Sequence, residues 1–187
     1  KKIYWDKWLS YVQAQICNHF EKIEKDRKSL KKFVSKNWYK DSKSSGGTYK
    51  ILKNGKIFDK VGVNKSTVSG IFSKKFRKSI LGAEVNGKYW ASGISVVAHM
   101  KNPKIPAIHF NTRFIVTSKS WFGGGIDLTP CFKDRKEEIY FHSKLKKVCK
   151  ENSKNYIKYK EWCDKYFFLP HRKESRGIGG IFFDYEN

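Results

Sequence analysis

Two Asn-Gly dipeptides constrain the fold of this chain of 187 residues more than any other feature. Asn54-Gly55 stands between two strand-like runs in "YKILKNGKIFDKVGV", and Asn86-Gly87 precedes the run "KYWASGISVVAHM". Asn-Gly favours the tight turn of a β-hairpin, because both residues tolerate a positive φ. Two more strand-like runs follow, "IPAIHFNTRFIV" and then the glycine-rich stretch "SWFGGGIDLTPCF". The middle of the chain is therefore predicted to be a mainly antiparallel sheet.

Helical patterns flank these strands. Apolar residues at three- and four-residue spacing predict one or two amphipathic helices over residues 4–38, and a Ser/Gly-rich loop follows at residues 40–48. Residues 134–152 and 153–168 are predicted to form two further helices, the second ended by Pro170, and "GIGGIFFDYEN" a last strand. This order predicts an α+β fold rather than a βαβ nucleotide-binding fold.

The composition fits one globular domain. Hydrophobic residues make up 39% of the chain and aromatic residues 16%, which is too apolar for a disordered tail. No run approaches the roughly 18 apolar residues of a membrane span. The chain begins without Met and without the apolar core of a signal peptide, so we expect an excised or processed segment whose targeting sequence was removed or never existed.

The formal net charge of +23 raises the question of nucleic-acid binding. Only six of the 40 basic residues are Arg, the residue typical of bidentate phosphate and base recognition. The lysines are also spread along nearly the whole chain. The charge therefore favours a solvated lysine-rich surface, which would also attract small polyanionic substrates.

The four cysteines argue against a metal or disulfide framework. None forms a CxxC pair, and a chain with this many core residues does not depend on disulfides. We expect reduced thiols in a reducing compartment.

Strand alternation gathers polar residues of an unusual kind on one face. His109, Asn111 and Arg113 point to the same side of their strand, and Ser95 and His99 share a face of another. A solvated outer face would explain such rows equally simply. However, the chain uses Lys almost everywhere else, so a row of His, Asn and Arg favours a functional site.

The same strand alternation applies to the glycine-rich stretch. Gly123, Gly125 and Asp127 share a face, so two positions beside the carboxylate lack side chains and a flat ligand could approach the backbone there. The alternative is a bulged or twisted strand against which another backbone packs closely. Asp127 lies between apolar neighbours, and we expect it to face N–H donors from the protein or from a ligand. The stretch is not a phosphate-binding loop, because the required spacing is absent.

Several segments resemble the oxygen-dependent coproporphyrinogen III oxidase family of heme biosynthesis. They are "VGVNKSTVSG", "NPKIPAIHFNTRF", "WFGGGIDLTP" and "EWCDKYFFLPHRKESRGIGGIFFD", and more loosely "SGGT" at residues 45–48. They occur in order from about residue 45 to the end, and the GGGxDLTP and HRxExRGIGGIFFD motifs are highly specific. The helices before residue 45 carry no motif of the family.

The resemblance implies a largely antiparallel sheet flanked by α-helices on both faces, and a homodimer. It implies oxidative decarboxylation of two propionates of coproporphyrinogen III to the vinyls of protoporphyrinogen IX. O2 is the oxidant and no organic cofactor is needed. Members of the family work in cytosol, mitochondrion or plastid, so we expect a cytoplasmic or organellar protein without a transmembrane segment. No nucleic-acid partner is expected.

The resemblance also implies roles for residues. The catalytic set is His109, Asp127 and Arg113, with His109 as proton donor and Asp127 facing the pyrrole nitrogens; the substrate-binding set is Ser95, Asn111, Thr112, Arg113 and Arg176. His171 matches a position linked to dimerisation. Four histidines match positions once proposed as metal ligands in bacterial relatives: His99, His109, His142 and His171. Since His142 is predicted on a helix and His171 at a turn, we do not expect one metal site built from all four.

The chain departs from the family in three respects. Thr112 replaces an aromatic residue, the loop between Arg113 and Trp121 is short, and family members continue well past the last strand. Residues 1–187 are therefore expected to form a single domain that lacks the C-terminal third. Two alternatives stay open, a family-derived domain without activity and a basic nucleic-acid-binding module.

Overall fold

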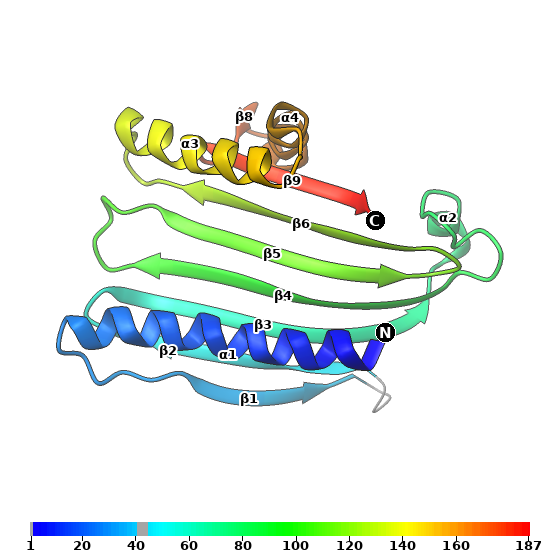
Figure 1. Cartoon of the computed structure of the whole chain (residues 1–187), viewed down its shortest axis with the longest axis horizontal. Coiled ribbons are helices and arrows are strands. Elements are labelled where there is room, and N and C mark those ends of the chain that lie inside the picture. The colour runs from blue at the N-terminus through cyan, green and yellow to red at the C-terminus, as the bar shows by residue number, and fades with distance from the viewer. Residues whose placement is uncertain (1, 41–44) are drawn as a thin grey trace.

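The computed structural model describes residues 2–40 and 45–187, and its centre is one antiparallel sheet (Figure 1). The seven strands lie in the order β1-β2-β3-β4-β5-β6-β9. Their bounds are Val34–Tyr39, Gly46–Lys53, Phe58–Ile71, Lys88–Met100, Ala107–Val116, Ser120–Thr129 and Gly179–Glu186. The helices are α1 (Lys2–Asp26), α2 (Lys74–Arg77), α3 (Arg135–Glu151) and α4 (Tyr156–Tyr166). A separate short hairpin pairs β7 (Phe168–Leu169) with β8 (Glu174–Ser175).

The Asn54-Gly55 hairpin turn is where the sequence predicts it, whereas Asn86-Gly87 ends the connection over residues 72–87, which contains α2, and does not close a tight hairpin. Asn54 has a φ of 54°, and the N–H of Gly55 donates to the carbonyl of Phe58 at 2.9 Å, which closes the hairpin of β2 and β3. Gly87 has a φ of 68° and leads directly into β4. The predicted antiparallel sheet is confirmed.

Helix α1 covers one face of the sheet. The core between them contains apolar side chains from α1, β2, β3 and β4: Leu9, Cys17, Leu52, Phe58, Val61, Val63, Ile94, Val96 and Ala98. Because strand residues alternate, Ile94, Val96 and Ala98 take the α1 face, and Ser95 takes the other. The apolar row and the polar row predicted for β4 are thus on opposite sides.

The predicted helical region over residues 4–38 is wrong beyond Asp26. The N–H of Ser29 donates to the carbonyl of Glu24 at 3.0 Å, and the N–H of Lys28 to that of Lys25 at 2.8 Å, around Lys28 with a φ of 58°. This is the Schellman helix end, which usually takes Gly at the left-handed position. Residues 34–39 instead form the edge strand β1, paired with β2.

The predicted loop over residues 40–48 is shorter than expected, because β2 already begins at Gly46. Residues 41–44 lie outside the described part of the chain.

Helices α3 and α4 gather around β9, at the opposite end of the sheet from α1 (Figure 1). The predicted helix over 134–152 is α3, whose first N–H groups are capped by the Asp134 carboxylate. Leu145 and Cys149 of α3 pack with Ile126 and Ile181, on the same face as α1.

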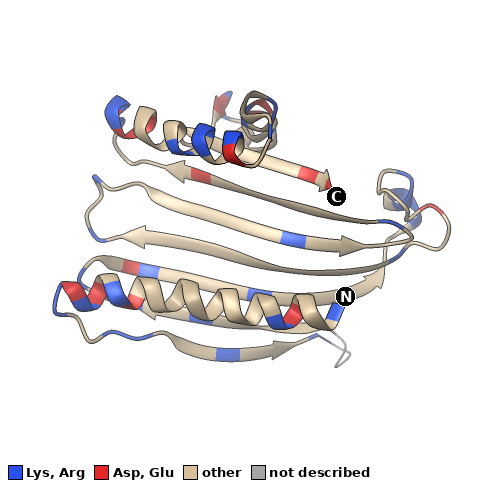
Figure 2. Ribbon diagram, in the orientation of Figure 1, with Lys and Arg blue, Asp and Glu red and all other residues tan. Residues whose placement is uncertain are grey.

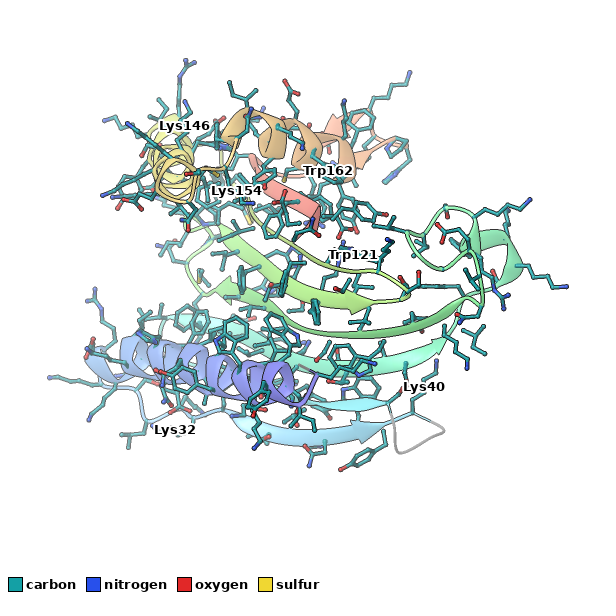
Figure 3. The ribbon with its side chains drawn as sticks, turned by 45° about the vertical axis from the view of Figure 1, so that its right-hand side comes forward. Lys32, Lys40, Trp121, Lys146, Lys154 and Trp162 are labelled. Atoms are coloured by element: carbon teal, nitrogen blue, oxygen red, sulfur yellow. The ribbon has the colours of Figure 1, made fainter. Side chains whose placement is uncertain are left out.

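Helix α4 corresponds to the predicted helix over 153–168 and reaches the other face. Trp162 and Tyr166 pack on Phe182, with ring centroids 5.6 and 4.1 Å apart, and Trp162 lies beside the β9 end of the sheet in Figure 3. Helices therefore lie on both faces, as expected. In the described residues, no helix combines the length and apolar character needed to cross a membrane.

Candidate active site

The face of β4 and β5 that α1 leaves free forms the floor of a cavity of about 400 Å³. Tyr166 and Phe167, at the C-terminal end of α4, form its wall. It is lined by Ser66, Val68, Ala91, Ser92, Gly93, Ile94, Ser95, His109, Asn111, Thr112, Arg113, Tyr166 and Phe167. Five of the predicted site residues therefore line one cavity.

Strand register brings the polar residues together. Ser95 pairs with Asn111 across β4 and β5, while His109 and Arg113 pair with Asp127 and Gly123 across β5 and β6. Residues paired in this way point to the same face. The predicted polar row is confirmed, and it lines the open cavity on this face of the sheet.

Thr112 contributes to the cavity differently from its neighbours. It pairs with Ile94, which is buried in the α1 core, so strand alternation turns its side chain to that face. Thr112 borders the cavity through its main chain.

The charged residues of the central strands belong to the same region. Strands β4, β5 and β6 each carry one Lys, Arg, Asp or Glu residue: Lys88, Arg113 and Asp127 (Figure 2). Two of these three therefore lie at or directly beside the cavity.

Asp127 is the buried charge next to the cavity, with 1% of its surface exposed. Its Oδ1 lies 2.8 Å from His109 Nδ1, and its Oδ2 accepts a hydrogen bond of 2.8 Å from Arg176 Nη2. A carboxylate only accepts, so His109 carries a proton on Nδ1 and its Nε2 remains available. The expected N–H donors of Asp127 come from the protein.

Arg176 lies behind the cavity wall rather than in the lining. Its guanidinium stacks 3.8 Å from the ring centroid of Phe167, and the edge of that ring contacts His109 with centroids 6.0 Å apart. Asp127, His109, Phe167 and Arg176 therefore form one contact network at one end of the cavity.

Arg113 at the other end is held by a carboxylate that the sequence patterns did not single out. Its Nη2 donates to Asp184 Oδ2 at 2.7 Å, and Trp121 Nε1 donates to Asp184 Oδ1 at 2.9 Å. Figure 3 shows Trp121 near the end of β9. The guanidinium also lies 5.6 Å from the ring centroid of Phe182.

The three glycines face protein atoms, so the expectation of a flat floor open to a ligand is wrong. A Cβ on Gly124 would come within 2.6 Å of the Asn111 carbonyl oxygen, and one on Gly125 within 2.7 Å of that of Ile181. At Gly123 it would meet Asp184 and Arg113. Close packing, the alternative reading, explains all three.

The four histidines are not brought together. His99 is exposed at the end of β4, and His171 is exposed in the turn between β7 and β8. His142 of α3 uses both ring nitrogens within the protein. Its Nε2 lies 2.9 Å from the Ile178 carbonyl oxygen and its Nδ1 lies 2.7 Å from the Tyr156 hydroxyl, so this residue connects α3 to its neighbours. Within residues 2–40 and 45–187, no group of three or more His, Cys, Asp or Glu could hold a metal ion.

A buried thiol, Cys163, lies near the network. Burial raises the pKa of Cys163 to about 12, and the charge of Asp127 adds to the effect. None of the four cysteines is in a disulfide.

Sequence reasoning missed the cavity wall and the partner of Arg113. Tyr166 and Phe167 lie in the quoted motif "EWCDKYFFLPHRKESRGIGGIFFD", but nothing in the motif indicates that α4 ends over β5. Asp184 lies two residues after Phe182 and therefore shares its face of the last strand. Pairing of that strand with the glycine-rich strand would have placed Asp184 over Arg113.

Comparison with known proteins identifies the family. The family model described as "Coproporphyrinogen III oxidase" matches residues 5–187. The oxygen-dependent coproporphyrinogen-III oxidase of Rickettsia bellii (strain RML369-C) is 53% identical over 186 residues, which cover 96% of this chain and 66% of the relative. Those of Rickettsia rickettsii (strain Sheila Smith) and Rickettsia conorii (strain ATCC VR-613 / Malish 7) are 52% identical with the same coverage.

The chain thus spans just under two thirds of the length of these relatives. The match extends through every strand of the sheet and through the cavity. The chain belongs to the coproporphyrinogen III oxidase family.

Proposed function

We propose that the protein carrying this chain catalyses the oxygen-dependent decarboxylation of coproporphyrinogen III to protoporphyrinogen IX. In each of two steps a propionate loses CO2 and two electrons and becomes a vinyl group, and O2 takes up these electrons with two protons and leaves as H2O2. The observation that carries the proposal is the cavity lined by Ser95, His109, Asn111 and Arg113 in a member of this family.

Arg113 is the residue suited to bind a substrate carboxylate. Asp184 occupies one of its terminal nitrogens, which leaves the other terminal nitrogen for a ligand. Its Nε is buried and has no hydrogen-bond partner among the residues that the structure describes, as is also true of Arg176. A substrate carboxylate would therefore meet Arg113 at its remaining terminal nitrogen.

His109 is the residue suited to move a proton. Asp127 holds the proton on Nδ1, so the neutral ring presents Nε2 as an acceptor for a proton from the substrate. Once the ring is protonated, Nε2–H becomes a donor that can supply a proton to the reduced oxygen. The Asp127 carboxylate stabilises the imidazolium. Asp127 therefore acts through His109 and holds it in one orientation.

The remaining lining residues bind the substrate and enclose it. Ser95 and Asn111 offer hydrogen-bonding groups on the sheet, and the rings of Tyr166 and Phe167 offer apolar surface to a macrocycle and exclude water. We further propose that O2 is the co-substrate, that no organic cofactor takes part, and that the full-length protein is a homodimer.

The test uses the full-length protein and coproporphyrinogen III, with and without O2, and products separated by chromatography. Aerobic formation of protoporphyrinogen IX, with one H2O2 for each CO2, is expected, and a matched anaerobic sample should give none. A complete, folded protein that leaves the propionates intact in air would refute the proposed activity.

A further inference from the structure

Asp184, the partner of Arg113, lies at a bulge between the last two strands of the sheet. Strands β6 and β9 pair regularly from Leu128 to Gly124, but Phe122 then pairs with Glu186, so the register shifts. Gly123 consequently faces two residues of β9, Asp184 and Tyr185. A bulge of this kind bends a strand and redirects a side chain.

The bulge stores backbone strain. Tyr185 has a φ of 58°, which is uncommon for a residue with a side chain. A conformation of this kind costs on the order of 1–3 kcal/mol and persists where its surroundings fix it. The ring of Trp121, 5.2 Å from that of Tyr185, supplies such a contact.

Asp184 lies on the same face of β9 as Phe182, as strand alternation predicts, and both of its oxygens are used there. Oδ2 accepts from Arg113 Nη2 at 2.7 Å, and Oδ1 accepts from Trp121 Nε1 at 2.9 Å. The Asp184 side chain is 16% exposed, so its ion pair with Arg113 is only partly screened by solvent. Trp121 thereby fixes Asp184, and Asp184 fixes Arg113.

Gly123 provides the space for this pair. A Cβ at this position would collide with Asp184 Oδ1 and lie 3.0 Å from Arg113 Nε. An alanine would therefore push the carboxylate and the guanidinium away from the strand. The absent side chain of Gly123 and the Trp121 hydrogen bond both serve this contact.

We propose that Asp184 is a positioning residue for the reaction. It holds the Arg113 guanidinium in one orientation at the cavity, so that the substrate carboxylate meets the remaining terminal nitrogen in a fixed position. This proposal rests on the proposed function. Asp184 does not line the cavity, so its effect passes through Arg113.

A double-mutant cycle on the full-length enzyme tests this proposal. In Asp184→Asn the Trp121 hydrogen bond can persist, but the charge that anchors Arg113 is lost. We expect kcat/KM to fall roughly tenfold or more, mainly through kcat, because a mobile Arg113 still attracts carboxylates. In an Arg113→Ala background the same change should cost less than about twofold, because the residue it acts through is gone.

Gly123→Ala is the second variant and should reproduce the loss, again only when Arg113 is present. Glu174→Gln is the matched control, since Glu174 pairs with Arg172 on the surface at 2.7 Å and should leave kcat/KM unchanged. Thermal unfolding of each variant separates loss of position from loss of fold.

Two results would overturn the role of Asp184 while the proposed function stands. One is near wild-type kcat/KM in Asp184→Asn, and the other is an equal loss with and without Arg113, which would indicate a structural role. A wild-type enzyme without aerobic turnover would instead refute the proposed function itself.

Discussion

Asp127 illustrates how the structure changes the role of a single residue. The sequence places a lone acid beside glycines, and family resemblance points it at the substrate. In the folded chain both of its oxygens are bonded to protein side chains, and one of these, His109, reaches the cavity. The carboxylate therefore influences the cavity through the orientation and tautomer of the imidazole.

Asp127→Asn and Asp127→Ala should consequently differ. Asp127→Asn keeps the volume of the side chain and is expected to lower kcat about 10²-fold or more, because His109 loses the partner that sets its tautomer. Asp127→Ala also leaves Arg176 without its carboxylate and should reduce the free energy of unfolding by about 1–3 kcal/mol. Steady-state kinetics and thermal unfolding of both variants check this, and near-normal turnover in Asp127→Asn would contradict it.

The four thiols should react in two classes. Burial raises the pKa of Cys17 to about 11 and that of Cys163 to about 12, and it also raises the pKa of Cys149, whereas Cys131 is exposed. A chromogenic disulfide reagent at neutral pH should therefore label only Cys131 rapidly in the folded chain, and all four after denaturation. Cys131→Ser should abolish the rapid phase, and a rapid phase that survives would contradict the described burial.

At the scale of elements, one buried carboxylate joins α1 to the hairpin of β2 and β3. Glu24 is fully buried and accepts hydrogen bonds from the main-chain N–H groups of Lys56, Ile57 and Phe58 at 2.7–2.9 Å. Gly55 makes room for it, since a Cβ there would collide with the carboxylate. Burial raises the pKa of Glu24, but the N–H of Phe58 and the other donors outweigh it and leave the pKa below its usual 4.5.

This contact predicts a pH-dependent contribution to stability. Because the pKa of Glu24 is lowered in the folded state, its carboxylate contributes fully to the free energy of unfolding above about pH 4.5. This contribution is lost as the pH falls through the pKa of Glu24 in the folded protein. Glu24→Gln should reduce the free energy of unfolding by about 1–3 kcal/mol at pH 7. The difference from wild type should shrink in more acidic solution.

Denaturant unfolding at pH 7 and below pH 4.5 measures this difference, with Glu161→Gln on the exposed surface of α4 as the control. A pH-independent difference between Glu24→Gln and wild type would exclude the proposed coupling.

The helices and strands also show which sequence patterns were sufficient to predict the fold. Asn-Gly turns and two-residue alternation predict the sheet because both are local consequences of backbone geometry. The end of α1 was missed because Lys28 occupies a left-handed position that usually signals itself by Gly. Partners such as Asp184 and Phe167 escaped prediction because they depend on the pairing of β9 with β6 and on where α4 ends, which are contacts between distant segments.

At the scale of the whole molecule, the two faces of the sheet have separate tasks. One face packs α1 and α3 and carries most of the core, while the opposite face of β4 and β5, with the end of α4, forms the cavity. Charged residues are frequent on the helices and rare on the central strands (Figure 2), so the +23 charge describes the surface more than the site. Arg113, Asp127, Arg176 and Asp184 form two ion pairs beside the cavity.

The most direct test of this account fills the cavity from its floor. In the full-length enzyme, Ser95→Trp would place an indole in the space of about 400 Å³ above β4, whereas His99→Trp changes an exposed residue farther along the same face. We predict that Ser95→Trp lowers kcat/KM for coproporphyrinogen III about 10²-fold or more without unfolding the protein, and that His99→Trp retains activity. A folded Ser95→Trp enzyme with wild-type kcat/KM would contradict the assignment of this cavity as the active site.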